Sequence, residues 1–404
     1  MTEPQPPAIV LGGLETAVPV TRSLGRAGIA VHASGGPRDP VRYSRHTTSY
    51  TVVEEGDDQA RAWLDWLRGP APRGVLMPVC DTGIELVARH ADELRELGHV
   101  TGEQRPEVVL AMLDKAATYA VADRAGVPRP WTRRIDPGDP RTPDDVTFPC
   151  AVKPLSTHRF VALTGITEKL LVATGPAELD ALLARTAGVG ADVFVTEIVP
   201  GGDDRLPSYF TYLDEGGEPL FEFTVRKIRQ EAPHFGVGCY VIAEWDPQIA
   251  ELGLRLARAA GLVGPAQIEF KRDARSGEPK LMECNHRISL LVQLLRVSGI
   301  DLPLLVHRSA TGARSLPAPT PVYGARLWHP LPDYRAMRVL RSEGELTTRT
   351  WLRSLMHPLH FTVWDPRDPR PTLVDTGRHI ARLARRALRR SRQPRLTPAP
   401  ADTC

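Results

Sequence analysis

The segment Gln267–Arg287 (QIEFKRDARSGEPKLMECNHR) holds the side chains of this sequence that are best suited to chemistry. Two runs that mix apolar and polar residues, Ala266–Lys271 and Lys280–Asn285, flank a polar stretch that contains Gly277. This pattern predicts two short strands joined by a turn. The sequence therefore predicts a β-hairpin whose strands present alternate side chains on opposite faces.

Three oxygen-bearing side chains of this hairpin are predicted to share one face. Glu283 and Asn285 lie two residues apart, so Cys284 points to the other face, and pairing near the middle of the hairpin brings Glu269 across from them. Carboxylate and amide oxygens are the ligands that Mg²⁺ prefers, and Arg287 just beyond offers a planar fork for phosphate or carboxylate. The alternative is an ordinary hairpin with a solvated polar face.

Three lysines upstream of the hairpin are candidates for binding an anion. Lys115 lies in the first turn of a predicted helix closed by Gly126, where a solvated surface lysine is the alternative. Lys153 lies inside an apolar predicted strand (FPCAVKP), and burying an ammonium group without a partner costs several kcal/mol. Lys169 precedes another apolar strand, Leu170–Ala173. An anionic ligand is therefore expected near Lys153.

The N-terminal region has the pattern of a βαβ unit. The apolar run Ala8–Leu11 ends at Gly12 and Gly13, a helical pattern follows, and Ile29–His32 is a second apolar run. The glycine pair lacks the spacing of a dinucleotide fingerprint, which favours a tight structural turn. Asp81 follows the end of a later predicted strand, where open α/β sheets bind ligands, although a helix N-cap is an equally good interpretation.

Composition limits the function classes. With 404 residues the chain is long enough for two or three domains, and its net charge of +3 does not favour nucleic acid as a partner. Its five cysteines are dispersed without C-x-x-C spacing, which predicts reduced thiols. Neither a signal peptide nor a transmembrane run is recognisable in the sequence, so a cytoplasmic location is expected.

The order of these motifs resembles the ATP-grasp superfamily, and within it carboxylate–amine ligases of the D-aspartate ligase type. The residues that carry the likeness are Lys115, Lys153 in AVKP, Glu197 in TEIVPG, Glu269 in IEFKRD, and Glu283 and Asn285 in MECNHR. The resemblance implies an α/β fold, α+β in its ATP-grasp part. It implies a Rossmann-like pre-ATP-grasp domain with a parallel sheet (1–110), an ATP-grasp domain (111–312) and a C-terminal extension (313–404). The small lobe of the ATP-grasp domain would span about 115–192 and the large lobe about 193–312.

The resemblance also implies roles for individual residues. ATP and Mg²⁺ or Mn²⁺ are the expected cofactors. The phosphates would be held by Lys115 and Lys153, with Lys169 as a further cover. The adenine edge would meet the backbone at Glu197, Ile198 and Val199, and the ribose would meet Asp204 or else Asp203. The metal ligands would be Glu269, Glu283 and Asn285, and the cations at the reacting phosphoryl group would be Arg226, Lys227 and Arg287.

Two features depart from the family pattern. The loop after Lys153 (LSTHRFVAL) has no glycines with which to cradle phosphate. The family's Asn-Pro-Arg is here Asn285-His286-Arg287, so His286 either replaces proline without consequence or contacts substrate.

The activity implied is ATP-dependent joining of a small carboxylate to an amine, with amino acids as the expected substrate class, through an acyl phosphate and with release of ADP and phosphate. The alternatives are a catalytically degenerate ATP-binding regulatory or scaffold protein, and a small-molecule kinase on the same fold. A homodimer is a further expectation.

The last predicted helix, 376–393, combines an apolar stripe with many arginines. Its apolar residues recur with helical spacing, and eight arginines but no acid lie between Arg378 and Arg395. The pattern fits either a surface helix docked by its apolar stripe or a basic amphipathic element that makes peripheral contact with an anionic membrane.

Overall fold

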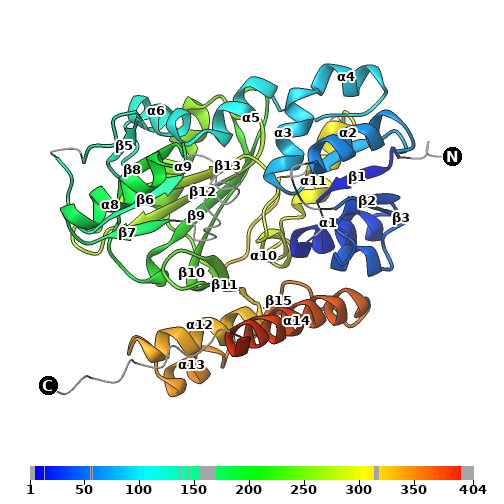
Figure 1. Cartoon of the computed structure of the whole chain (residues 1–404). Coiled ribbons are helices and arrows are strands. Elements are labelled where there is room, and N and C mark those ends of the chain that lie inside the picture. The colour runs from blue at the N-terminus through cyan, green and yellow to red at the C-terminus, as the bar shows by residue number, and fades with distance from the viewer. Residues whose placement is uncertain are drawn as a thin grey trace, which may run out of the picture.

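The structure is a computed structural model that describes residues 5–392 apart from 13, 55, 57, 103, 137, 143–144, 155–169 and 314–317. Its strands form one seven-stranded and two four-stranded sheets. Figure 1 shows the N-terminal sheet on one side, the other two sheets on the opposite side, and the C-terminal helices along the lower edge.

The N-terminal sheet is parallel, in the order β3-β2-β1-β4. Its elements are β1 (Ala8–Leu11), α1 (Leu14–Arg26), β2 (Val31–Gly35), η1 (Pro40–Tyr43), β3 (Ser49–Val52), α2 (Gln59–Arg68), β4 (Val75–Pro78), α3 (Asp81–Arg89) and α4 (Ala91–Glu96). The predicted parallel α/β architecture is confirmed. Gly12 has a φ of +99° and a Cβ there would lie 3.0 Å from the Sγ of Cys80, so the first βα connection is a tight structural turn.

The second four-stranded sheet is antiparallel, in the order β5-β8-β6-β7. It contains β5 (Thr132–Ile135), β6 (Cys150–Pro154), β7 (Leu171–Ala173) and β8 (Val193–Glu197), and α8 (Pro176–Ala187) packs its apolar side chains into the same core. Lys153 is in β6, as predicted, and faces the cavity described below.

The seven-stranded sheet is the largest, in the order β13-β12-β9-β10-β11-β14-β15. Its first five strands along the chain are β9 (Pro207–Leu213), β10 (Pro219–Glu231), β11 (Val237–Ala243), β12 (Gly264–Arg272) and β13 (Pro279–Asn285). Residues of α5 (Pro106–Leu113), α6 (Lys115–Ala125) and α9 (Pro247–Ala259) share a buried apolar cluster with this sheet. The helices α10 (Val292–Val297) and α11 (Leu302–Ala310) pack instead into a cluster shared with the N-terminal sheet.

The C-terminal segment is built into the rest of the molecule. Its strands β14 (Arg326–Trp328) and β15 (His360–Phe361) complete the large sheet, and its helices are α12 (Pro330–Ser342), α13 (Thr348–Ser354) and α14 (Arg370–Arg392). Two buried ion pairs anchor it: Asp368 accepts from Arg22 of α1 at 2.9 Å, and Asp333 accepts from Arg229 of β10 at 2.6 Å. The division into three domains stays a prediction, because two strands of the expected extension belong to the large sheet.

The start of α14 packs against η1 of the N-terminal region. Arg378 lies 3.7 Å from the buried Asp39 and is itself partly exposed, whereas Ile380, one of the apolar residues of the predicted helix, is 57% exposed. The side chains of residues 382–392 and the whole of 393–404 lie outside the described part, so the membrane expectation remains a prediction.

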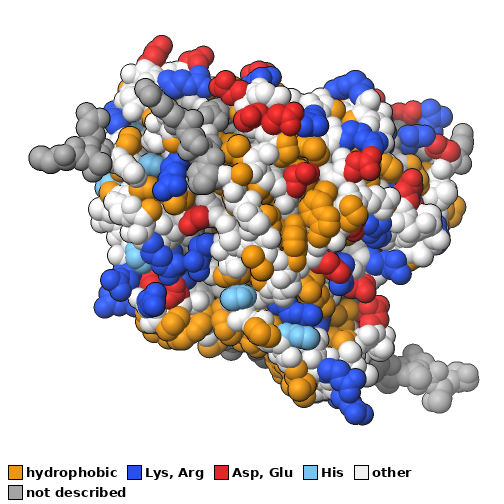
Figure 2. All heavy atoms as spheres, turned by 180° about the vertical axis from the view of Figure 1, so that it is seen from behind, with side chains coloured by type: hydrophobic (Ala, Val, Ile, Leu, Met, Phe, Trp, Pro, Cys, Tyr) orange, Lys and Arg blue, Asp and Glu red, His pale blue; other side chains and the backbone are white. Residues whose placement is uncertain are grey.

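The surface carries both signs of charge. Figure 2 shows basic and acidic side chains interspersed over most of the face opposite to that of Figure 1. Within the described residues, every helix is too short or too polar to cross a membrane. The four cysteines in this part of the chain, Cys80, Cys150, Cys239 and Cys284, are free thiols.

Candidate active site

The predicted hairpin forms in the predicted register. Strands β12 and β13 are antiparallel, and Glu269 lies directly opposite Glu283 while Gln267 lies opposite Asn285. Cys284 points to the other face, into the apolar cluster beneath the sheet, where burial raises the pKa of its thiol to about 12. The hairpin therefore brings the two carboxylates together on one face, as the alternation of side chains predicts.

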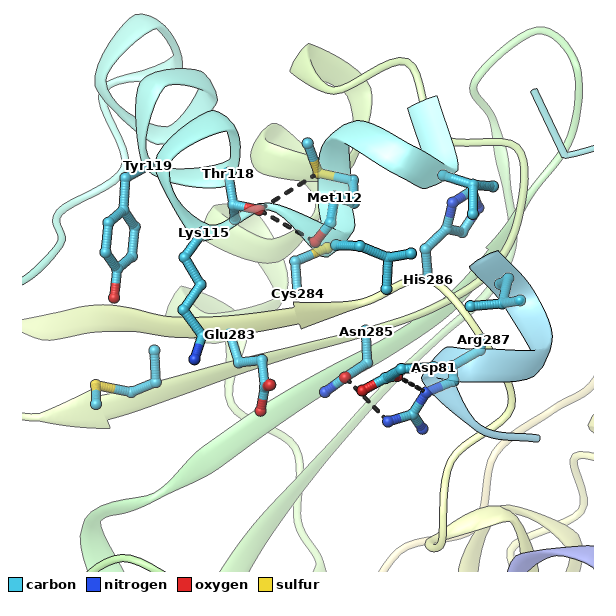
Figure 3. A pocket seen from close by; sticks show the side chains of 14 residues that line it. Asp81, Met112, Lys115, Thr118, Tyr119, Glu283, Cys284, Asn285, His286 and Arg287 are labelled. Carbon is cyan, nitrogen blue, oxygen red and sulfur yellow. Dashed lines mark hydrogen bonds and ion pairs between the residues drawn. The ribbon is translucent and has the colours of Figure 1, made fainter. Parts of the chain in front are cut away.

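The partners of these oxygens differ. Glu269 is mostly buried and accepts from the ammonium group of Lys227 at 2.8 Å. Glu283 is exposed and has no ion-pair partner among the described residues. Asn285 Oδ1 accepts from Arg287 at 3.3 Å. Figure 3 shows Lys115 extending from α6 toward Glu283, beside Asn285 and Arg287.

Arg287 joins the hairpin to the N-terminal region. Its Nε donates to Asp81 Oδ1 at 2.5 Å, and its side chain is 19% exposed. Asp81 occupies the first turn of α3, at the carboxyl end of β4, and it does not cap that helix. Its carboxylate therefore orients the guanidinium of Arg287, so the N-cap interpretation is wrong, and a role of Asp81 in ligand binding stays a prediction.

A cavity lies between the four-stranded antiparallel sheet β5-β8-β6-β7 and the β12–β13 hairpin. Glu269 and Glu283 form part of its floor, Lys115 and Lys153 its cationic walls, and Ile198 and Val199 its apolar end. The complete lining comprises Asp81, Lys115, Tyr119, Pro130, Ala151, Lys153, Leu170, Thr196, Glu197, Ile198, Val199, Leu206, Gln230, His234, Phe235, Gly236, Glu269, Lys271, Met282 and Glu283.

Most lysines of this chain lie in or beside the cavity. The chain has six lysines among 51 Lys and Arg residues. Lys115, Lys153 and Lys271 line the cavity, Lys227 pairs with Glu269, and Lys280 pairs with Glu197 at 2.8 Å. The sixth, Lys169, lies outside the described residues. The few ammonium groups of this chain are thus concentrated around one cavity, and a compact ammonium charge suits phosphate oxygens.

The segment after β8 was predicted to meet the adenine edge. Ile198 and Val199 line the cavity, and no acceptor for the backbone N–H of Val199 is found among the described residues. The backbone N–H of Glu197 instead donates to Trp131 O at 3.0 Å. The carboxylate of Glu197 is held by Lys280, and by Arg275 at 3.2 Å. This pairing ties the segment to the hairpin.

The two acids considered for ribose have other surroundings. Asp203 is 7% exposed and accepts from Gln230 Nε2 at 2.8 Å, from Gln230 N at 3.1 Å and from His234 N at 2.8 Å. Its oxygens therefore hold the turn after β10. Asp204 is exposed and does not line the cavity. The structure thus brings neither carboxylate into the site, and a ribose contact by Asp204 would require the segment to move.

Arg226 also lies apart from the cavity. It pairs with Glu244 at 2.7 Å, whereas its neighbour Lys227 reaches Glu269. Adjacent residues of a strand point to opposite faces, so only one of this pair can serve the site. The structure thus places Lys227 beside Glu269 and Arg226 away from the cavity, and a role of either cation at the phosphoryl group stays a prediction.

Lys271, which the sequence analysis missed, is 6% exposed and has no ion-pair partner among the described residues. Burial lowers the pKa of its ammonium group, and the charge of Lys227 adds to this while Asp203 opposes it. It lies two residues after Glu269 on the same face of β12, so the alternation that located the carboxylates also identifies Lys271. Gln230 at the end of β10, and His234 and Phe235 in the turn that follows, also line the cavity; they lie in the segment 226–235, which was expected to contribute to substrate specificity.

His286, for which two roles were open, is buried behind the hairpin and borders a pocket that Lys115, Glu283 and Arg287 also line. It is 4% exposed, its Nε2 donates to Val263 O at 2.8 Å, and its own carbonyl accepts from Gln104 at 3.0 Å. Burial lowers its pKa to about 4, so the ring is neutral at pH 7. These contacts favour the harmless replacement of proline, and a contact with substrate stays a prediction.

The buried ring makes a prediction about acid stability. Between pH 6.5 and about 4 the unfolded chain binds a proton at His286 that the folded protein does not. The free energy of unfolding is therefore expected to fall as the pH falls through this window, by about 3 kcal/mol from this residue. Urea unfolding at several pH values should show a smaller fall for His286→Gln than for the wild type. An identical pH dependence of the two proteins would contradict the assignment.

The donor set fits a divalent cation and a polyphosphate. Glu283 and Glu269 oppose each other, Asn285 adds an amide oxygen, and the cavity carries three lysines but an apolar end at Ile198 and Val199. Hard oxygen ligands suit Mg²⁺, and compact ammonium groups suit phosphate oxygens. The apolar end suits a base.

No protein-family model matches the chain. A D-aspartate ligase from Enterococcus faecium (strain Aus0004) is 23% identical over 275 residues, which is 64% of this chain and 64% of that ligase. The match thus spans less than two thirds of the relative's length. A solved N5-carboxyaminoimidazole ribonucleotide synthetase in complex with ADP has a TM-score of 0.60 at 14% identity, covering 81% of this chain and 82% of its own. An L-amino acid ligase from Bacillus licheniformis has a TM-score of 0.55 at 14% identity, covering 78% and 75%.

Proposed function

We propose that this chain, which has the ATP-grasp fold shared by these structures, is an ATP-dependent ligase that joins a small carboxylate to an amine. The observation that carries the proposal is the pair Glu269 and Glu283, opposed on the floor of a cavity lined by lysines. Amino acids are the proposed substrates, because the chain is similar to a D-aspartate ligase and to an L-amino acid ligase.

Magnesium and ATP would be held by separate groups of residues. Glu269, Glu283 and Asn285 would ligate the metal, and Lys115 and Lys153, with Lys169, would hold the phosphates. The backbone at Ile198 and Val199 would face the base. When bound, ATP with its metal supplies a phosphoryl group that converts the carboxylate into an acyl phosphate, which the amine then attacks with release of ADP and phosphate.

The chain's own contribution is positioning and charge neutralisation. Lys227 is 7% exposed and fixed by Glu269, so its charge is already in place before substrate binds. Arg287 is held by Asp81 and presents a planar donor edge to a carboxylate or an acyl phosphate. Because both cations are oriented by carboxylates, little reorganisation is required during reaction.

An ADP-release screen of the purified protein against pairs of amino acids and small carboxylates tests this proposal. ADP release that depends on both an acid and an amine, together with an amide product, supports a ligase. ADP release with a phosphorylated product and no amide identifies the kinase alternative. Nucleotide binding without turnover on any pair identifies the scaffold alternative.

We also propose that the arginine-rich end of α14 makes peripheral contact with anionic membranes. Replacing Arg385, Arg386, Arg389 and Arg390 with glutamine should reduce co-sedimentation with phosphatidylserine vesicles at low salt, since each arginine near such a surface contributes about 1 kcal/mol. High salt should weaken the wild type similarly. The docked start of α14 is unchanged in this variant, so its fold should be preserved. A wild-type protein that never co-sediments with the vesicles would contradict the membrane interpretation.

The homodimer and the cytoplasmic location expected from the sequence remain predictions.

A further inference from the structure

A second cluster of metal-binding side chains lies far along the chain from the ATP site, where the C-terminal segment meets the N-terminal helix. His329 follows β14, Asp375 and His379 lie one turn apart on α14, and Glu15 lies in the first turn of α1. Asp375 and His379 are each 4% exposed. One potential ligand atom from each of His329, Asp375 and His379 lies within 4.8 Å of the others.

The separations between these atoms suit a small ion. His329 Nε2 lies 3.3 Å from Asp375 Oδ2, and His379 Nε2 lies 3.6 Å from Asp375 Oδ1 and 3.9 Å from Glu15 Oε1. Around Zn²⁺, with bonds of about 2.0–2.2 Å, tetrahedral ligands are separated by roughly 3.3–3.6 Å. The two separations from Asp375, each measured to one oxygen of its carboxylate, match this spacing, whereas Glu15 lies outside the group of atoms that are all within 4.8 Å of one another.

One oxygen of the cluster is unsatisfied. Asp375 Oδ1 is buried and accepts no hydrogen bond among the described residues. A buried oxygen without a donor is costly, and a cation is a natural remedy.

We propose that His329, Asp375 and His379 bind a borderline divalent transition-metal ion such as Zn²⁺, and that the ion fastens α14 to the end of β14 in the large sheet. Two imidazoles and one carboxylate form a donor set that suits Zn²⁺ better than Mg²⁺, and a water molecule can complete four-coordination. The site differs in this respect from the oxygen-only ligands around Glu283.

A cavity beside the cluster gives a metal ion access to it, and one existing contact must open when the ion binds. His329 and Asp375 border a cavity of about 280 Å³ whose other lining side chains are mostly apolar, including Leu331, Phe361 and Trp364. The contact that must open involves Arg335, whose Nη2 lies 3.4 Å from His379 Nδ1. An arginine only donates, so metal binding at Nε2, which leaves the ring proton on Nδ1, requires this contact to open.

Metal binding to the full-length chain tests the proposal. Protein stripped with EDTA is titrated with Zn²⁺ in excess Mg²⁺, which occupies oxygen-only sites, and bound zinc is measured after gel filtration. Co²⁺ is then used as a spectroscopic probe, because a four-coordinate site with imidazole ligands gives visible absorption. One equivalent of zinc, a rise in Tm on binding, and the Co²⁺ bands are expected.

The variants identify the ligands. His379→Ala and His329→Ala, which come from different elements, should each lose the Co²⁺ bands and the rise in Tm. Two controls should retain both: Glu283→Gln at the ATP site, and Glu343→Gln with Glu345→Gln in the exposed group around His234. Circular dichroism without metal checks that each variant is folded. The proposal is overturned if the stripped wild type takes up no zinc in excess Mg²⁺, or if either histidine variant keeps the full absorption.

Discussion

Glu283→Gln is expected to lower the rate of ADP release by about 100-fold or more while the protein stays folded, as for the loss of one preorganised charge-stabilising group. Glu283 is exposed and unpaired within the described residues, so an amide of the same shape costs the fold little. The metal, however, loses one of two carboxylates. Steady-state ADP release and thermal unfolding of the variant measure the two effects separately.

A matched control lies in the same hairpin. Glu278 is exposed in the turn between β12 and β13, and Glu278→Gln removes the same charge without touching the cavity. Glu269→Gln gives a useful contrast, because it also strands the buried ammonium group of Lys227 and should lower stability as well as turnover. If Glu283→Gln releases ADP as fast as the Glu278→Gln control does, Glu283 is not a metal ligand.

Lys153→Ala is expected to weaken ATP binding by about 2–5 kcal/mol, the range for losing a desolvated charge-assisted contact. An exposed ion pair contributes only about 1 kcal/mol or less. Lys153 lines the cavity from β6 of the four-stranded antiparallel sheet, and the carboxylates of the hairpin line the same cavity. Isothermal titration calorimetry with a non-hydrolysable ATP analogue and Mg²⁺ measures the change.

Arg134→Ala is the control for lost surface charge, because Arg134 is 63% exposed on β5 of the same sheet. Lys153→Arg tests whether a compact charge is needed, since it keeps the charge but enlarges the head group. Unchanged affinity of Lys153→Ala would return this residue to an ordinary surface role.

The hairpin was predictable because its information is local. Alternation along β12 and β13, with a turn at Gly277, sufficed to place Glu269 opposite Glu283. The same rule would have found Lys271 had it been applied beyond the carboxylates. The parallel N-terminal sheet was predictable for a similar reason, since short buried strands alternate with helical segments there.

Contacts between distant segments were not predictable. The sequence does not distinguish Asp203 from its neighbour Asp204. Only the fold shows that the carboxylate of Asp203 accepts hydrogen bonds from Gln230 and His234. The C-terminal segment gave no sign that Asp368 would meet Arg22, because an ion pair between residues so far apart leaves no periodic pattern. Its incorporation into the large sheet through β14 was missed for the same reason.

The concentration of lysine around one cavity has a practical consequence for work with this protein. Amine-reactive dyes, amine-coupled sensor surfaces and lysine crosslinkers select side chains by their ammonium group, and here five of the six lysines line the cavity or pair with the acids that line it. Labels attached in this way would occupy the very region under study. Probes are better attached through an added tag than through the chain's own amines.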